Sequence, residues 1–160
     1  MNKPISKPQL LQQRLVSHAA VLLKVCANLP HTSQATHVSR QLLRSGTAAA
    51  ANYGEARGAE SRSDFVHKLR IVLKELNETT VWLQLIIESS LISPEKMSPI
   101  VAENAELCRI IAASIRTAGG FSRDQKPVPA QRSALTDPQF VTSFCKYRYQ
   151  CSDASLHAGF

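Results

Sequence analysis

The chain has 160 residues, of which 44% are hydrophobic and 19% are charged, and its formal net charge is +7 at pH 7. This composition is sufficient for the core of one domain and excludes a chain that is disordered throughout. Because no run of about 18 apolar residues occurs, a membrane-spanning helix is excluded as well. Residues 1–14 lack the apolar core of a signal peptide, so we expect a cytoplasmic protein whose positive charge suits a polyanionic partner.

The first expected helix extends from residue 8 to residue 29. Leu15, Ala19 and Leu22 are separated by four and three positions, the spacing that places side chains on one face of a helix. Pro30 ends this helix, because proline disfavours helical geometry in the residue before it.

The second expected helix covers residues 34–57, with Ser33 or Thr36 as its N-terminal cap and Gly58 beyond its end. Its stripe of apolar and small residues, again at steps of four and three, comprises Val38, Leu42, Ser45, Ala49, Asn52 and Ala56. Residues 45–51 are nearly all small. Such a segment allows a neighbouring backbone to approach closely, either within one bundle or between subunits.

The third expected helix starts after Ser61 or Ser63, either of which can cap it, and ends near Ser90. Asp64 lies in its first turn, where negative charge is favourable. The apolar repeat runs the whole length of this helix and comprises Phe65, Leu69, Val72, Leu76, Thr79, Leu83 and Ile86. Further apolar residues widen the stripe enough to contact more than one helix, which is typical of a bundle.

The fourth expected helix has Ser93 as its cap and Pro94 at its first position. Apolar residues recur over positions 97–115, and two glycines at 119 and 120 end the helix. Links of about two to six residues force neighbouring helices to run antiparallel. Residues 1–119 therefore predict an all-α, four-helix up-and-down antiparallel bundle.

The last part of the chain, residues 120–160, has a different composition. Pro127, Pro129 and Pro138 interrupt it, so we expect a flexible, disordered C-terminal tail. Residues 140–151 are apolar and aromatic, but a lone strand has no partner, so we expect at most one docking segment there.

The sequence gives no support for catalysis and only a weak signal for a metal site. It has no phosphate-binding glycine loop or nucleophile motif. Glu75 and Glu78 have no histidine three positions later, which a di-metal bundle requires. Cys145 and Cys151, separated by five residues, are a weak zinc signal. We expect no catalytic residue, metal, cofactor or small-molecule substrate.

Basic side chains gather on the second and third helices, at Arg40, Arg44, Arg57, Arg62, Arg70 and Lys74. Two pairs of them are four residues apart on one helix face, and two arginines flank the turn. Together they could line a surface that contacts the phosphates of a nucleic acid. The alternative is a solvated face with internal ion pairs, such as Lys74 with Glu78 or Arg57 with Glu60.

Four polar residues lie on or beside the apolar stripes: Asn52, Glu55, Glu75 and Glu78. Buried polar groups need partners, so we interpret these residues as packing and register groups, the alternative being a ligand cavity. Trp82, Tyr53 and Leu85 fall off the main stripes. They indicate an interface between subunits of an oligomer.

A multi-part motif lies between residues 40 and 86. Its positions are Arg44, Ser45, Gly46, Thr47, Asn52, Tyr53, Glu55, Ala56, Ser61, Arg62, Asp64, Phe65, Leu73, Lys74, Glu75, Glu78, Thr79, Trp82 and Leu83. This motif resembles that of a bacterial family of four-helix bundles, the 23S rRNA-intervening-sequence proteins, which includes the accessory variability determinant of diversity-generating retroelements. Two features depart from the pattern: four alanines at 48–51 replace a Ser-Val-Gly-Ala type of segment, and residues 120–160 lie outside it.

The resemblance implies a homopentameric barrel of bundles without enzymatic activity, and a basic adaptor that binds nucleic acid and a reverse transcriptase. We therefore expect a non-enzymatic, oligomeric scaffold that binds RNA, DNA or a ribonucleoprotein partner through phosphate contacts. The alternative is a protein–protein interaction module whose positive charge is incidental.

Overall fold

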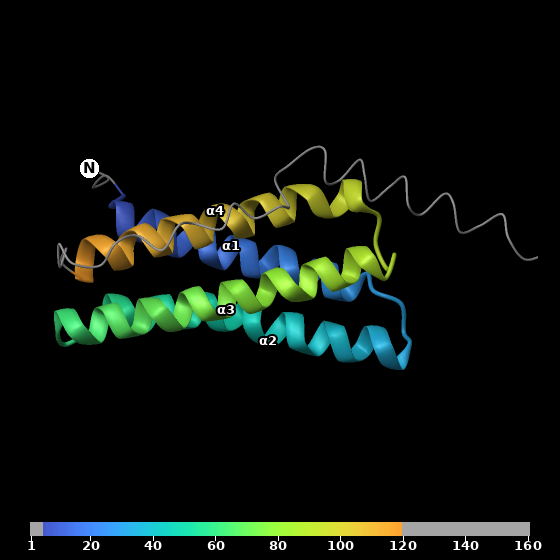
Figure 1. Ribbon diagram of the computed structural model, residues 1–160, viewed down its shortest axis with the longest axis horizontal. Helices are drawn as coiled ribbons and strands as arrows, with labels where there is room; N and C mark the ends of the chain where they lie inside the picture. The colour runs from blue at the N-terminus through green and yellow to red at the C-terminus, as the bar shows by residue number, and fades with distance from the viewer. Residues whose placement is uncertain (1–4, 120–160) are drawn as a thin grey trace, which may run out of the picture. The chain divides into compact units, whose positions relative to one another are not determined.

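The structure is a computed structural model, and it describes residues 5–119. This part of the chain forms four α-helices: α1 (Lys7–Ala27), α2 (Ser33–Arg57), α3 (Arg62–Glu88) and α4 (Pro94–Gly119) (Figure 1). Every expected helix boundary lies within two residues of the observed one. The all-α prediction is confirmed, whereas the expected tail at 120–160 lies outside the described residues.

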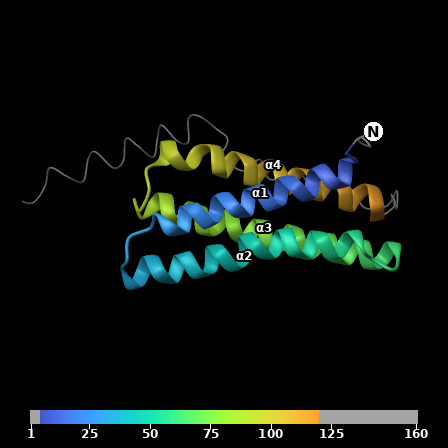
Figure 2. The same ribbon diagram turned by 180° about the vertical axis from the view of Figure 1, so that it is seen from behind.

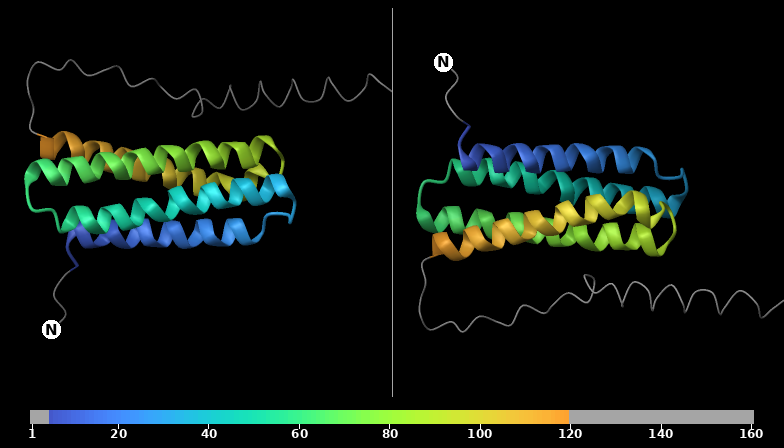
Figure 3. Two further views of the ribbon diagram at one scale, coloured as in Figure 1. Left: turned by 90° about the horizontal axis from the view of Figure 1, so that it is seen from below. Right: turned by 90° about the horizontal axis from the view of Figure 1, so that it is seen from above.

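Successive helices run antiparallel and pack beside one another (Figure 2). The α1–α2 and α3–α4 links lie at one end of the bundle, and the α2–α3 turn lies at the other end (Figure 3). Helix α3 packs against both α2 and α4, while α1 packs mainly against α2 and contacts α4 least. The predicted four-helix up-and-down bundle is therefore confirmed.

Side-chain caps determine where the helices begin. The Oγ atom of Ser61 accepts a hydrogen bond from the amide of Asp64 at 3.1 Å, as predicted for α3. At α2 the cap is Thr32, whose hydroxyl accepts from the amide of Ala35 at 3.2 Å. The prediction of Ser33 or Thr36 is wrong, because both residues already lie within the helix, where their backbone is helical.

The buried side chains form two groups, each built from all four helices or from the links between them. The group nearer the α2–α3 turn contains Leu15, Ala19, Ala49, Ala50, Tyr53, Ala56, Leu69, Val72, Leu76, Leu107 and Ile111. The other group contains Leu22, Val25, Leu29, Ala35, Val38, Leu42, Leu83, Ile86 and Met97. Burial of these apolar surfaces is the main force that holds the helices together.

The predicted stripe of α2 is wrong at one turn. Tyr53, expected off the stripe, is only 5% exposed and belongs to the core. Asn52, expected on the stripe, is half-buried and donates a hydrogen bond to the carbonyl oxygen of Ala48 in the same helix, at 2.8 Å. The core therefore lies one position further along this turn, where an aromatic ring fills more apolar volume than a carboxamide.

Candidate functional site

The α2–α3 interface contains a network of charged side chains. Arg44 forms an ion pair with Glu78, and its second terminal nitrogen lies 3.7 Å from Oε2 of Glu75. The indole of Trp82 donates a second hydrogen bond to Glu78, at 3.2 Å. The hydrogen bonds from Arg44 and then Trp82 hold the pKa of Glu78 below its usual value. The expected pair of Lys74 with Glu78 is not formed, because Arg44 occupies that carboxylate.

Two further contacts join α2 to α3. Lys68 Nζ lies 2.5 Å from Oε2 of Glu55, and the hydroxyl of Thr79 donates to that of Ser45 at 3.0 Å. Glu75 is only 9% exposed, and its Oε2 makes no hydrogen bond within the described residues. Arg44 is the cation that compensates this buried charge.

The remaining basic residues differ in their surroundings. Arg40, Arg70 and Lys74 are exposed and form no ion pair within residues 5–119. Arg70 and Lys74 are four residues apart, so they share one face of α3, while Arg40 lies on α2. Of the six predicted cations, these three therefore lie on helix faces without an ion pair among the described residues, whereas Arg44 is paired with carboxylates.

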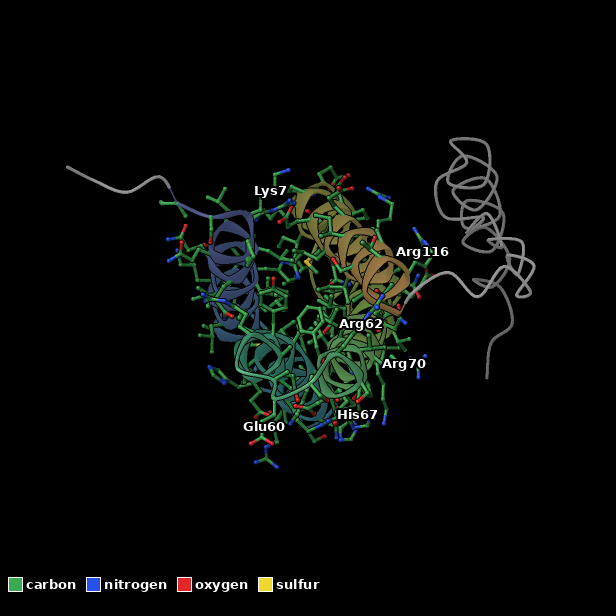
Figure 4. The ribbon with its side chains drawn as sticks, turned by 90° about the vertical axis from the view of Figure 1, so that its left-hand side faces the viewer. Lys7, Glu60, Arg62, His67, Arg70 and Arg116 are labelled. Atoms are coloured by element: carbon green, nitrogen blue, oxygen red, sulfur yellow. The ribbon has the colours of Figure 1, made fainter. Side chains whose placement is uncertain are left out.

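Arg57 and Arg62 lie at the end of the bundle where α2 passes into α3. Both line a hollow of about 600 Å³ between α1, α2 and α3. Nε of Arg62 donates a hydrogen bond to the carbonyl oxygen of Ala118 in the last turn of α4. Figure 4 looks onto this end and shows Arg62 over it, reaching toward α4. The expected pair of Arg57 with Glu60 is not formed.

A buried polar network that the sequence analysis missed joins α1, α3 and α4. His18 is 4% exposed, and its Nε2 lies 3.0 Å from Oδ1 of Asn104. The amide nitrogen of Asn104 donates to the carbonyl oxygen of Leu76 at 3.0 Å and to the hydroxyl of Thr80 at 2.8 Å. Oδ1 is therefore the free acceptor of this carboxamide, and Nε2 of His18 carries the hydrogen. Burial lowers the pKa of His18.

A signal for His18 existed in the sequence. It lies three positions after Leu15 and four before Leu22, so it shares their face of the helix. Asn104 likewise lies within the apolar repeat of α4. When each of two helices carries a polar residue on its apolar stripe, the two side chains are candidates for a hydrogen bond with each other in the bundle core.

Two observations bear on other classes of site. Within residues 5–119, no three side chains of His, Cys, Asp or Glu gather closely enough to hold a metal ion. None of the four described helices combines the length and hydrophobicity that crossing a membrane requires.

The helix order and these interhelical contacts define a four-helix bundle protein with unpaired cations on its surface. The family model described as 23S rRNA-intervening sequence protein matches residues 11–113. The chain belongs to the 23S rRNA-intervening sequence protein family, as the resemblance predicted.

One solved structure supports the same assignment. The chain is similar to the crystal structure of a protein of unknown function from the S23 ribosomal protein family of Bacteroides thetaiotaomicron. The two are 34% identical with a TM-score of 0.64, and the match covers 69% of this chain and 98% of the other. No curated protein matches the chain.

Proposed function

We propose that this protein is a non-enzymatic, cytoplasmic helical scaffold that binds RNA, or a ribonucleoprotein partner such as a reverse transcriptase, through phosphate groups. The observation that carries the proposal is the set of exposed cations without carboxylate partners: Arg40, Arg57, Arg70 and Lys74. A cation that is not already neutralised can replace the counterions of a phosphate and so contribute binding free energy. Arg44 is not one of the proposed phosphate-binding residues, because the carboxylates of Glu75 and Glu78 already lie beside it.

The scaffold is also proposed to be a homo-oligomer, for which the resemblance implies a pentamer. Val81 is 58% exposed and Leu85 is 40% exposed, and both lie on the face of α3 that carries Arg70 and Lys74. Exposed large apolar side chains are also found on α1, at Leu10, Val16, Val21 and Leu23. Contact with a second copy would remove these side chains from water. The mass of the protein in solution tests this part of the proposal.

The test of RNA binding compares two double variants that lose the same charge. Arg70→Gln with Lys74→Gln removes unpaired cations. Arg14→Gln with Arg109→Gln is the matched control, because these arginines pair with Glu103 and Glu106. Binding of single-stranded RNA is measured over a range of salt concentrations, and the logarithmic salt slope is expected to shrink by about 0.7 for each lost phosphate contact.

The expected result is weaker binding and a smaller salt slope for the first variant only. Equal losses in the two double variants would contradict the assignment of these residues. Absence of binding by the native protein at about 50 mM salt, a condition in which electrostatic binding is strong, would contradict the function.

The exposed apolar residues Val81 and Leu85 favour a second candidate, a protein-interaction module. In that case partner binding would resist salt and would fail in Leu85→Ser or in Trp82→Ala, where the half-buried indole beside Glu78 is lost. Binding that resists salt and is insensitive to the Arg70 and Lys74 changes would favour this candidate over RNA binding.

A further inference from the structure

Helix α1 carries a second stripe of apolar side chains that the bundle does not cover. Val16, Ala20, Leu23 and Ala27 are separated by four, three and four positions, the spacing that aligns side chains along one face of a helix. All four are exposed, Val16 by 53% and Leu23 by 51%. The residues that α1 contributes to the interior are a separate set: Leu15, His18, Ala19, Leu22 and Val25. A helix that is apolar on two sides is suited to contacts on both.

The exposed stripe lies on the side of α1 that is turned toward α2. Gln12, four positions before Val16, donates a hydrogen bond to the carbonyl oxygen of Ala50 in α2 at 3.1 Å. Arg14, by contrast, forms an ion pair with Glu103 of α4 at 2.8 Å. The stripe therefore runs along the outer surface of the bundle beside α2, away from α4 (Figure 2).

This surface lacks charged side chains. Between Arg14 and Lys24, α1 has no acidic or basic residue except His18, which is buried. Likewise, α2 has none between Arg44 and Glu55. A nucleic acid or an acidic peptide would therefore find no cation within these two segments to bind. Two copies of a chain with a net charge of +7 repel each other, and a surface without cations is where they can approach most closely.

The stripe is also complementary to a copy of itself that runs in the opposite direction. When two α1 helices pair antiparallel about a two-fold axis midway between positions 20 and 23, Val16 lies opposite Ala27 of the second copy, and Leu23 lies opposite Ala20. Each large side chain then meets an alanine, which allows the two helices to interdigitate without overlap. A two-fold axis brings the same patch of both copies together, so one stripe is sufficient for the contact.

We propose that the stripe formed by Val16, Ala20, Leu23 and Ala27 is a two-fold contact surface for a second copy of this chain. The inference rests on the oligomeric part of the proposed function and specifies it: copies associate in pairs through antiparallel α1 helices. Removal of the stripe from water supplies the driving force. A cyclic pentamer would be joined through the stripe to a second pentamer, so the number of copies is even in either case. The proposed RNA contacts on α3, a helix that does not neighbour α1 in the bundle, stay outside the contact.

The first test measures the mass of the full chain in solution by light scattering. The native protein is expected to contain an even number of copies. Leu23→Glu places two carboxylates in the contact without a cation nearby, so this variant is expected to have half the native mass.

The matched control is Leu10→Glu, which introduces the same charge at another exposed leucine of α1. Leu10 lies four positions before Arg14, on the side of α1 that carries the ion pair with α4, and is not part of the stripe. The control should keep the native mass. Circular dichroism and thermal unfolding of both variants check that the bundle is retained, as expected for two exposed positions.

A mixing experiment tests the antiparallel register. Ala20→Lys should also halve the mass, because the longer side chain displaces Leu23 of the second copy. In an equimolar mixture of Leu23→Glu and Ala20→Lys, one of the two symmetric contacts joins the new carboxylate to the new ammonium group. The other contact keeps the native Leu23 opposite the native Ala20. The mixture should therefore recover the native mass, whereas neither variant does so alone.

The proposal is overturned if the native protein contains an odd number of copies, a monomer included, in which case a different partner covers the stripe. It is also overturned if Leu23→Glu keeps the native mass, if Leu10→Glu loses as much mass, or if the mixture fails to recover it.

RNA binding by the same proteins separates this contact from the scaffold function. If RNA binds with a steep salt dependence while Leu23→Glu keeps the native mass, the contact is wrong and the scaffold function stands. If the mass halves as expected but the native protein binds no RNA, the contact is supported and the RNA scaffold is wrong.

Discussion

Nε2 of His18 lies 3.0 Å from Oδ1 of Asn104, and this hydrogen bond joins α1 to α4, the two neighbouring helices that contact each other least. Both side chains are almost completely buried. Since these two helices approach each other at few residues, a satisfied polar pair can determine how they are aligned. The same pair makes the bundle sensitive to any change that leaves one partner without the other.

Acid should destabilise the protein through His18. Burial lowers the pKa of His18 in the folded protein, so the unfolded chain binds a proton more readily. The contribution of this group to stability is complete above about pH 6.5, the usual pKa of histidine, and is lost as the pH falls toward the lower folded value. Urea unfolding at pH 7.5 and at pH 5.5, conditions about one unit on either side of that pKa, should show a lower free energy of unfolding in acid.

The control for this prediction is His18→Gln, which keeps an amide donor for Asn104 but does not titrate. The difference in free energy of unfolding between the two pH values should be smaller in the variant. An equal difference in the two proteins would show that other groups cause the acid effect.

Removal of the Asn104 carboxamide should be costly. Asn104→Ala leaves Nε2 of His18 without an acceptor and opens a cavity, so we expect a loss of about 2–4 kcal/mol in the free energy of unfolding. Thr80→Ala removes only one of the two hydrogen bonds that Asn104 donates, because the carboxamide still reaches the carbonyl oxygen of Leu76, and it should cost about 1 kcal/mol. Equal losses in denaturant unfolding would mean that Asn104 contributes only through this one bond.

The sequence was sufficient to predict the four helices, their order and most of the core. Steps of three and four residues identify a buried face, and Pro30 and the serine cap at position 61 mark helix ends. The predicted buried face of α2 was wrong by one residue, with Asn52 expected in the core where Tyr53 lies. Small residues on several sides of that helix leave its buried face poorly defined in the sequence. The spacing from Leu15 and Leu22 places His18 on the buried face, but its hydrogen bond was missed because the partner, Asn104, lies 86 positions away in α4.

The charged site was predicted less well for a related reason. Spacing within one helix favours Lys74 as the partner of Glu78, but the neighbouring helix supplies Arg44 instead. Contacts between helices depend on their relative rotation and register, which the spacing in either helix leaves undetermined. The same limit explains why Arg57 and Arg62 were expected on one basic surface rather than around a hollow.

A double-mutant cycle should separate the two possible partners of Glu78. Neutralising Arg44 and Glu78, singly and together as Arg44→Gln and Glu78→Gln, should give a favourable coupling that declines in concentrated NaCl. The cycle with Lys74→Gln should give a clearly smaller coupling, since Lys74 forms no ion pair in the described structure. A larger coupling for Lys74 than for Arg44 in urea unfolding would contradict the observed pairing.

The coupling between Arg44 and Glu78 should also depend on pH. The pKa of Glu78 is lowered by its hydrogen bonds with Arg44 and Trp82. Its contribution is therefore present above about pH 4.5, near the usual pKa of glutamate, and is lost as the pH falls through the lower folded value. Repeating the cycle near pH 7 and near pH 3 should show this loss, whereas a coupling that persists unchanged in acid would point to a contact other than the ion pair.

Two glycines of α2 should respond oppositely to the same substitution. A Cβ atom at Gly46 would overlap Cδ1 of Leu22, which is completely buried in the core. A Cβ atom at Gly54 would lie 3.7 Å from Oε1 of Gln12, an ordinary van der Waals distance. In both positions alanine gains about 1 kcal/mol of helix propensity, but only at Gly46 does it overpack the core, at a cost of about 1–3 kcal/mol.

Gly54→Ala should therefore raise the free energy of unfolding by about 1 kcal/mol. Gly46→Ala should lower it by up to about 2 kcal/mol, because Leu22 has to move within a filled core. The variant Gly46→Ala with Leu22→Val, which removes the overlapping atoms, should recover part of the loss. A Gly46→Ala protein that gains as much stability as Gly54→Ala in urea unfolding would contradict the close packing of α1 on α2, since the two substitutions differ only in what the new methyl group contacts.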